Sequence, residues 1–232
     1  MQLLGLIGGM SWESSAQYYR LINEGYRAAR GPAASAPCLL WSFDFAHIEA
    51  LQRAGDWSEL TALMEDAGRR LVRAGADGLI ICTNTMHLMA EAVEQAAGVP
   101  LLHIADPTGA AIRAAGLNKV GLLGTAFTME QAFYRERLAQ RHGLEVIVPD
   151  AGDRALVHGV IYDELIAGVV SEASRAAYRA VITRLVARGA QAVILGCTEI
   201  MLLVRAEDST VPLFDTTSLH AEAAVQALLE PQ

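Results

Sequence analysis

The chain has 232 residues, of which 53% are hydrophobic, and a formal net charge of −8 at pH 7. This length and apolar content allow a substantial core and exclude disorder, and the acidic balance excludes a basic surface for nucleic acid. No apolar run approaches the ~20 residues of a membrane span, and the N-terminus lacks the basic start of a signal peptide. We therefore expect a cytoplasmic protein with neither membrane nor nucleic-acid partners.

Short apolar runs predict eight strands, separated by amphipathic stretches with helical periodicity. Runs such as GLIIC at 78–82 and AVILG at 192–196 are continuously apolar, which is typical of strands covered on both faces of a parallel sheet. Ser58 is a candidate helix cap, and Thr128 with Gln131 forms a capping-box pattern. The alternation predicts two doubly wound, flavodoxin-like α/β domains with parallel sheets. The predicted strands are 2–7, 38–43, 78–82, 100–104, 119–124, 145–148, 192–196 and 211–214.

Three segments of the first half recur in the same order in the second half, which indicates that one α/β unit is present twice. We place the first domain at 1–98 plus 210–232 and the second at 99–209. The last helix, at 218–229, is expected to return and pack on the first domain. The recurring pairs are GLIGGMSWESSAQYY with GLLGTAFTMEQAFYR, RLVRAGADGLIICTN with RLVARGAQAVILGCT, and VPLLHIAD with VPLFDTTS.

The chain holds three cysteines, Cys38, Cys82 and Cys197, whose odd number and wide spacing predict free thiols rather than disulfides. No cysteine or histidine cluster has the spacing of a zinc site, so we expect no metal. Lys119 is the single lysine and opens a predicted strand, which argues against a Schiff base with pyridoxal phosphate. We therefore expect chemistry without a cofactor.

Cys82 and Cys197 each end the third strand of one copy, and each is followed by threonine and further polar residues. Ligands of parallel α/β sheets bind at the carboxyl ends of strands, and a helix N-terminus there favours a thiolate. A cysteine in an apolar strand is more often a small core residue, and we interpret Cys38 in that way. The equivalent positions in both copies favour function for the other two. The polar residues that follow them, candidates for binding a carboxylate, are Thr83, Asn84, Thr85, Thr198 and Glu199.

The segments GLIGGMSWESS, CTNTMH and LGCTEI resemble the aspartate/glutamate racemase family, whose members racemise amino acids without a cofactor. The resemblance covers nearly the whole chain and implies a homodimer whose subunits have two similar domains, related by pseudo-two-fold symmetry, around a cleft. It also implies two thiols, here Cys82 and Cys197, that exchange a proton on opposite faces of the substrate Cα, one starting as thiolate and the other as thiol. We expect interconversion of L- and D-amino acids, with aspartate, glutamate or a broader set as substrates. A maleate isomerase, a hydantoin racemase and a non-catalytic carboxylate-binding protein remain alternatives.

Further site residues follow from the resemblance. It implies that Met10, in the first strand-to-helix turn, lines the substrate pocket, that Gln52 contacts the substrate, and that an acid near Asp44 lies beside the thiols. Asp44 is equally a candidate N-cap of the helix that follows it. Thr125 opens the corresponding turn of the second copy and is a candidate pocket hydroxyl.

One departure from the family concerns substrate choice. Some aspartate racemases of the family carry an essential lysine in the helix where this chain has Asp163 and Glu164. An acid there favours the amino group of a substrate over a side-chain carboxylate. We therefore include Glu164 among the substrate-binding residues and leave the amino acid open.

Two arginines and three histidines complete the candidates. Arg53 and Arg205 are possible partners of a second substrate carboxylate, although surface arginines are commoner. We place His87 in the first helical turn near the pocket and interpret His103 and His220 as structural.

Overall fold

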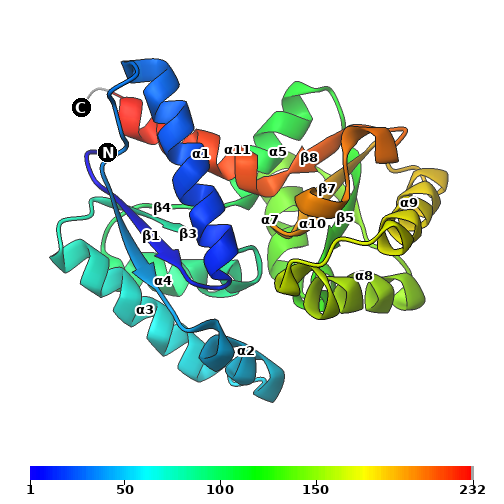
Figure 1. The fold of residues 1–232 in the computed structure, drawn as a ribbon, viewed down its shortest axis with the longest axis horizontal. Helices are drawn as coiled ribbons and strands as arrows, with labels where there is room; N and C mark the ends of the chain where they lie inside the picture. Colours follow the sequence, from blue (N-terminus) through cyan, green and yellow to red (C-terminus); the bar gives the residue numbers. More distant parts are fainter. Residues whose placement is uncertain (231–232) are drawn as a thin grey trace. The chain divides into compact units, whose positions relative to one another are not determined.

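The structure, a computed structural model, describes residues 1–230. The chain divides into two compact units (Figure 1). Unit 1 consists of Met1–Ile104 and the C-terminal segment that begins at His220, and unit 2 consists of Ala105–Leu219. The chain therefore leaves unit 1 after Ile104 and re-enters it at His220.

Within the described residues, unit 1 holds a four-stranded parallel sheet. Its strands are β1 (Leu4–Gly8), β2 (Cys38–Ser42), β3 (Gly78–Ile81) and β4 (Leu101–Leu102). Its helices are α1 (Trp12–Arg30), α2 (Phe45–Ala54), α3 (Trp57–Arg73), the 3-10 helix η1 (Thr85–Met89), α4 (Ala90–Ala97) and most of α11 (Thr216–Leu229). The strand order is β2-β1-β3-β4. Leu60 and Leu71 of α3 and Val93 of α4 cover one face of the sheet, and Tyr18 and Ile22 of α1 cover the other.

Unit 2 repeats this arrangement within the part of the chain that the structure describes. Its strands are β5 (Lys119–Gly124), β6 (Glu145–Ile147), β7 (Ala192–Gly196) and β8 (Leu213–Asp215). Its helical segments are α5 (Ala105–Ala114), α6 (Ala126–Glu130), α7 (Ala132–His142), α8 (Ala151–Asp163), η2 (Leu165–Ala167), α9 (Glu172–Ala187), α10 (Ile200–Leu203) and η3 (Ala206–Asp208). The strand order is β6-β5-β7-β8, and Val157 of α8 and Tyr178 and Leu185 of α9 belong to its apolar core.

The matching strand orders confirm the duplicated, doubly wound, flavodoxin-like architecture. All eight predicted strands are found, with ends that differ from the predictions by a few residues. Strands β1, β3 and β7 are buried at every position, as their continuous apolar runs indicated. The register pairs Ile7 with Ile81 in unit 1 and Gly124 with Gly196 in unit 2. The segments that follow these paired strands are therefore neighbours at one edge of each sheet.

The unit boundaries lie later in the chain than the positions 98/99 and 209/210 expected from the sequence. Strand β4 pairs with β3 and so stays in unit 1, whereas β8 pairs with β7 and so belongs to the sheet of unit 2. Helix α5 also belongs to unit 2. There Asp106 accepts two hydrogen bonds of 2.7 Å from Arg137 of α7.

Two predicted helix caps are wrong. Asp56, not Ser58, caps α3, because its carboxylate accepts a hydrogen bond from a backbone N–H in the first turn. Both residue types cap well, so the sequence does not distinguish them. Thr128 does not begin a capping box but lies inside a short helix, α6, which Thr125 caps. Helix α7 begins after Gln131 without a side-chain cap.

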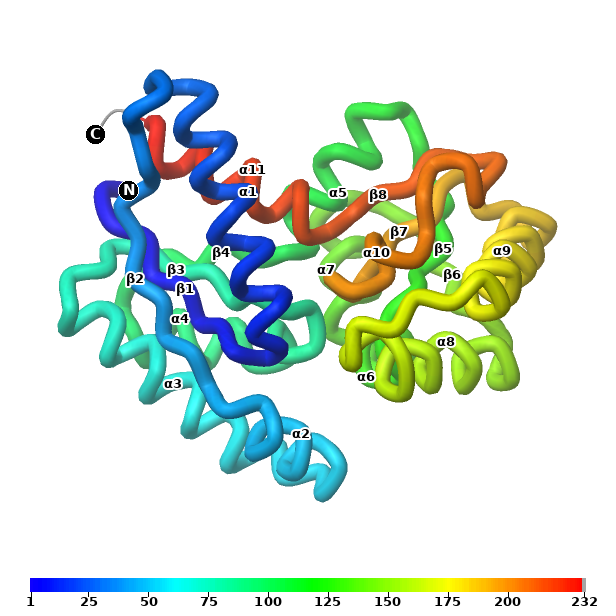
Figure 2. Tube along the Cα trace, in the orientation of Figure 1, coloured from blue at the N-terminus to red at the C-terminus, as the bar shows by residue number. Residues whose placement is uncertain are grey.

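The last helix returns to unit 1, as the sequence predicted. From His220 onward, α11 packs beside α1 (Figure 2). Its buried contacts join Ala221, Ala224 and Val225 to the cluster that contains Leu6 and Ile22. Among residues 1–230, no helix combines the length and the apolarity needed to cross a membrane.

Candidate active site

Cys82 follows β3 directly and is fully buried in unit 1. Its backbone N–H donates to the carbonyl of Ile7 at 2.9 Å, and its side chain belongs to the apolar cluster that contains Leu6 and Tyr18. Burial raises the pKa of the Cys82 thiol far above its ordinary value, and the neighbouring thiol of Cys38 adds to the rise. Cys82 is therefore a neutral thiol at pH 7.

The polar residues after Cys82 lead into η1. Asn84 and Thr85 are buried and Thr83 is partly buried. His87, in the first turn of η1, lies with Nδ1 2.8 Å from the carbonyl oxygen of Thr83. The sequence predicts His87 near the pocket, and in the structure its ring contacts the backbone of Thr83, the residue that follows Cys82.

The turn between β1 and α1 lies beside this segment, because β1 and β3 are neighbours in the sheet. Gly9 has a φ of +81°, and a Cβ there would lie 2.3 Å from the backbone N and O of Phe43. Ser15 Oγ accepts a 2.7 Å hydrogen bond from the Gly9 N–H, and Ser11 caps α1. Met10 is thus buried in a turn whose shape requires glycine.

Two predicted residues lie on or before α2. Gln52 is buried, and its side-chain amide donates to the sulfur of Met86 in η1 at 3.3 Å, so it is not a solvated helix residue. Asp44 caps α2 by accepting a 3.1 Å hydrogen bond from the Ala46 N–H, which confirms the capping interpretation. A position of its carboxylate beside the thiols stays a prediction.

In unit 2, Cys197 follows β7, and its thiol donates a hydrogen bond of 3.0 Å to Oε2 of Glu199. Burial raises the pKa of the Cys197 thiol well above its ordinary value, and the negative charge of Glu199 raises it further. Backbone N–H groups of Thr198 and Glu199 act in the opposite direction. Cys197 is therefore also a thiol at neutral pH.

The pKa shifts run against the stabilisation of a thiolate that a helix N-terminus favours at each sulfur. The hydrogen bonds predicted from a helix N-terminus are present at Cys197, but burial and the adjacent carboxylate outweigh them. At Cys82 burial is the leading cause of the shift. Each sulfur therefore needs a base that takes its proton, or a change of surroundings that lowers its pKa, before it can act as a thiolate.

Thr125 lies at the end of β5, next to the strand that leads to Cys197. Its hydroxyl caps α6 by accepting a hydrogen bond of 3.3 Å from the Thr128 N–H. The two strands approach closely here, since a Cβ on Gly124 would lie 2.9 Å from the carbonyl of Gly196. Thr125, Thr198 and Cys197 therefore share one edge of the sheet.

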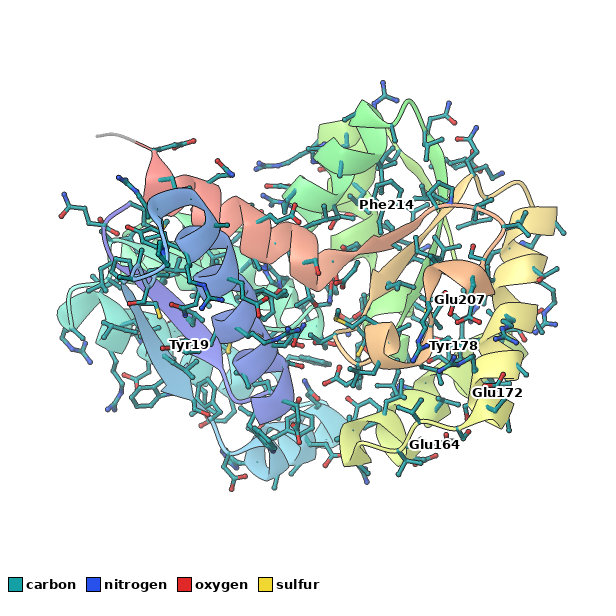
Figure 3. All side chains as sticks on the ribbon, turned by 45° about the horizontal axis from the view of Figure 1, so that its top comes forward. Tyr19, Glu164, Glu172, Tyr178, Glu207 and Phe214 are labelled. Carbon is teal, nitrogen blue, oxygen red and sulfur yellow. The ribbon has the colours of Figure 1, made fainter. Side chains whose placement is uncertain are left out.

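Glu164 ends α8 and accepts hydrogen bonds from two serine hydroxyls at the start of α9, Ser174 at 2.6 Å and Ser171 at 3.1 Å. Tyr178, labelled with Glu164 in Figure 3, is a residue that the sequence did not suggest. Burial raises its pKa, and electrostatic interactions with the ionisable side chains of Cys197 and Glu164 raise it further, so Tyr178 lies near both groups. Its only sequence signal is a place in the apolar stripe of α9.

The arginines predicted as carboxylate partners lie at the surface. Arg53 is paired with Glu49 at 2.6 Å, with 74% of its side chain exposed, and Arg205 is paired with Glu207 at 4.0 Å. The three cysteines are free thiols, as predicted.

The sequence profile of the Asp/Glu/hydantoin racemase family matches residues 7–224. The chain belongs to this family. Both Cys-Thr segments and the turn at Met10 lie within the matched range.

Individual racemase relatives agree with this assignment. A crystal structure of an Asp/Glu racemase candidate from Yersinia pestis has 53% sequence identity and a TM-score of 0.93, and covers 99% of this chain and 100% of its own. An aspartate racemase homologue from Pyrococcus horikoshii has 30% identity and a TM-score of 0.85 over 99% of this chain and 100% of its own. The broad specificity amino-acid racemase of Bacillus subtilis is 27% identical over 181 residues, which are 76% of each chain.

Proposed function

We propose that this chain is a cofactor-independent amino-acid racemase in which Cys82 and Cys197 are the two proton-transfer groups. The observation that carries the proposal is the repetition of one site: each of two sheets with the same strand order ends an internal strand on a Cys-Thr pair. Membership of the racemase family and the similarity to an amino-acid racemase support it. A homodimer and a cytoplasmic location stay predictions.

Racemisation breaks the Cα–H bond on one face of the substrate and forms a new one on the other. Because both sulfurs rest as thiols, Glu199 first accepts the proton of Cys197 through their 3.0 Å hydrogen bond. The Cys197 thiolate takes the Cα proton, the electron pair stays on the substrate as a carbanion, and the thiol of Cys82 donates a proton to the opposite face. Cys197 is then a thiol and Cys82 a thiolate, which is the state that accepts the opposite enantiomer.

The carbanion needs further stabilisation, because positioned proton transfer typically supplies only ~10²–10⁴-fold of the acceleration. The charge that leaves Cα delocalises into the substrate carboxylate, so hydrogen-bond donors belong there. We assign this role to polar residues beside the two sulfurs. They are Thr83, Asn84 and Thr85 in unit 1 and Thr125 and Thr198 in unit 2.

The substrate set is proposed to be broad, with aspartate and glutamate included. Glu164 stands where some aspartate racemases of the family have lysine, and its carboxylate is held by Ser171 and Ser174. A negative charge there disfavours a second substrate carboxylate and favours an ammonium group. We therefore expect neutral amino acids to be accepted beside the acidic ones. The family also includes hydantoin racemases, so a hydantoin belongs in the substrate panel.

The test is hydrogen exchange at Cα. The reduced protein is incubated in D₂O with L-aspartate, L-glutamate, a panel of neutral L-amino acids and a 5-substituted hydantoin, while proton NMR follows Cα–H loss and chiral chromatography follows the D-enantiomer. We expect exchange with at least one amino acid. A folded, reduced sample that exchanges none of them contradicts the proposal. Thermal stabilisation by a carboxylate without exchange would instead favour the binding protein.

Variants of the three cysteines test the assignment of roles. We expect Cys82→Ser and Cys197→Ser each to abolish racemisation, because the hydroxyl is far too weak an acid to replace either thiol. The matched control is Cys38→Ser, which removes the third free thiol and is expected to stay active. Full activity in either of the first two variants contradicts the two-thiol scheme.

A further inference from the structure

Three buried histidines and one tyrosine form a cluster in unit 1. His87, His103, His220 and Tyr18 are each at most 6% exposed. The ring of His87 lies 4.6 Å from that of His103 and 5.6 Å from that of His220, centroid to centroid, and Tyr18 meets His220 edge-on at 5.6 Å. We call these four residues the histidine cluster. Its members come from four separate segments of the chain.

The partners of His87 define its protonation state. Its Nε2 accepts a 3.2 Å hydrogen bond from the backbone N–H of Ile104, and its Nδ1 lies 2.8 Å from the carbonyl oxygen of Thr83. A backbone N–H only donates and a carbonyl oxygen only accepts, so Nε2 carries no proton and Nδ1 carries one. His87 is therefore a neutral ring in the Nδ1–H form.

His220 is held in the complementary form. Its Nε2 lies 2.8 Å from the carbonyl oxygen of Leu102 and therefore donates to it. Its Nδ1 lies 2.9 Å from the hydroxyl of Tyr18, which donates to a neutral ring. A charge on His220, which is buried beside His87, has a high desolvation cost, which favours this neutral form.

His87 and His220 lie at the two points where the chain leaves and re-enters unit 1. The chain leaves unit 1 after Ile104, whose N–H is bound by His87, and re-enters at His220 itself. His87 also donates to the carbonyl of Thr83, the residue that follows Cys82 in the chain. The His87 ring thus connects the segment after Cys82 with Ile104, where the chain leaves unit 1. Its contact with His220 connects the same ring with the point where the chain re-enters unit 1.

We propose that His87 is a positioning residue for Cys82, which rests on the function proposed above. Its Nδ1–H sets the orientation of the Thr83 carbonyl, and so of the Thr83–Asn84 peptide, which is separated from Cys82 by one peptide unit. Its Nε2 fixes that peptide relative to Ile104. A small rotation of this peptide moves the adjoining Cys82–Thr83 unit and so displaces the sulfur from the line of the Cα–H bond, and misplacement by about 1 Å reduces turnover by on the order of 10²-fold.

Two substitutions test the two hydrogen bonds of His87 one at a time. Asparagine can present an N–H near the position of Nδ1 and keep the Thr83 bond, whereas glutamine can present its oxygen near the position of Nε2 and keep the Ile104 bond. We expect His87→Asn to stay within about threefold of wild-type kcat, and His87→Gln to lose kcat by about 10–100-fold with KM little changed, as is usual for a lost orienting hydrogen bond. Equal kcat in both variants, or wild-type kcat in His87→Gln, overturns the proposal.

Tyr18→Phe is the control for a purely structural effect. It removes the hydroxyl that donates to His220 from the same cluster without touching Thr83. We expect it to lower the melting temperature about as much as His87→Gln while kcat stays at the wild-type level. If Tyr18→Phe and His87→Gln reduce kcat equally, the cluster acts on stability alone and the proposal is wrong.

Two readouts do not depend on turnover and separate this inference from the proposed function. Long-range ¹H–¹⁵N NMR of the wild type is expected to show His87 as the neutral Nδ1–H tautomer at pH 7, and a cation or the Nε2–H tautomer contradicts the proposal. Mass spectrometry of iodoacetamide labelling is expected to show faster modification of Cys82 in His87→Gln than in His87→Asn, with Cys197 unchanged. If these results hold while the wild type exchanges no substrate, the proposed function fails and the positioning role stands.

Discussion

The thiol of Cys197 and the carboxylate of Glu199 are joined by a hydrogen bond of 3.0 Å between residues only two positions apart. The carboxylate has opposite effects on the two protonation states of the sulfur. It stabilises the thiol as an acceptor and repels the thiolate by its charge, so it raises the pKa of Cys197 in addition to burial. It is also within hydrogen-bond distance of the sulfur, where it can take the proton away.

Replacement of Glu199 by glutamine therefore changes reactivity and catalysis in opposite directions. Without the negative charge the pKa of Cys197 falls, so we expect Glu199→Gln to be alkylated faster than wild type at Cys197 at pH 8. Turnover is expected to fall by about 10²-fold or more, because the group that accepts the thiol proton is lost. Labelling followed by peptide mass spectrometry and Cα–H exchange in D₂O measure the two effects on one sample.

The control for Glu199→Gln is Glu207→Gln. Glu207 is a surface acid of unit 2 with 66% of its side chain exposed, and its removal changes the net charge of the protein by the same amount. We expect wild-type labelling and turnover in this variant. Slower alkylation of Cys197 in Glu199→Gln would show that the carboxylate does not raise the pKa of that thiol.

A lysine in place of Glu164 tests the proposed basis of substrate choice. Glu164→Lys puts a positive charge where a side-chain carboxylate is disfavoured, and a charge-assisted hydrogen bond contributes about 1.5–3 kcal/mol. We expect the ratio of kcat/KM for L-aspartate to that for L-alanine to rise about tenfold or more. The substitution also removes the acceptor of Ser171 and Ser174, so a lower melting temperature accompanies it.

Glu164→Gln is the matched control for this experiment. Its amide oxygen can still accept from the serine hydroxyls, but it adds no positive charge. We expect its preference to change much less than that of Glu164→Lys. An unchanged ratio in Glu164→Lys, with the fold retained, would mean that the substrate side chain does not approach this residue.

The predictable part of the structure follows from local patterns and from the repeat. Buried runs such as β3 and β7 are recognisable because every residue is apolar, and the repeat places Cys82 and Cys197 at equivalent strand ends. The wrong cap of α3 also has a local cause. Asp56 and Ser58 are both residue types that cap helices well, and only the folded helix shows that Asp56 is its N-cap.

Tertiary contacts explain what the sequence could not predict. The hydrogen bond between Tyr18 and His220 joins residues 202 positions apart, and no local pattern marks it. The protonation of Cys82 depends on how completely the fold buries the sulfur, which a strand-end motif does not reveal. His87 was recognised as a residue near the pocket, but its role depends on the Ile104 backbone, which meets it only in the folded unit.

The buried thiols also predict a loss of stability at alkaline pH. The folded pKa of Cys82 and Cys197 is raised, whereas an unfolded cysteine ionises near ~8.5. The stabilising effect is fully present below the unfolded pKa and is lost as the pH rises from there through the folded pKa. Each thiol then lowers the free energy of unfolding by about 1.4 kcal/mol per pH unit.

Chemical denaturation between pH 7.5 and 10 measures this slope. Cys82→Ser removes one of the two titrating groups, so we expect its stability to fall less steeply with pH than that of the wild type. Equal slopes would show that Cys82 ionises as readily in the folded chain as in the unfolded one. The comparison is made in reducing buffer, because oxidation of free thiols would alter the slope for a different reason.

The turn at Gly9 provides the last prediction, on stability rather than chemistry. Gly9→Ala places a Cβ 2.3 Å from the backbone of Phe43 at a φ of +81°, and neither backbone segment can move aside without disturbing the β1–α1 turn. Gly55 has a similar φ of +71° but open space around it, so Gly55→Ala carries only the conformational cost, about 1–2 kcal/mol. Urea unfolding should show Gly9→Ala to be less stable than Gly55→Ala by at least ~1–3 kcal/mol, the usual cost of steric overpacking. Equal losses would mean that the conformation alone, and not the contact with Phe43, requires glycine beside Met10.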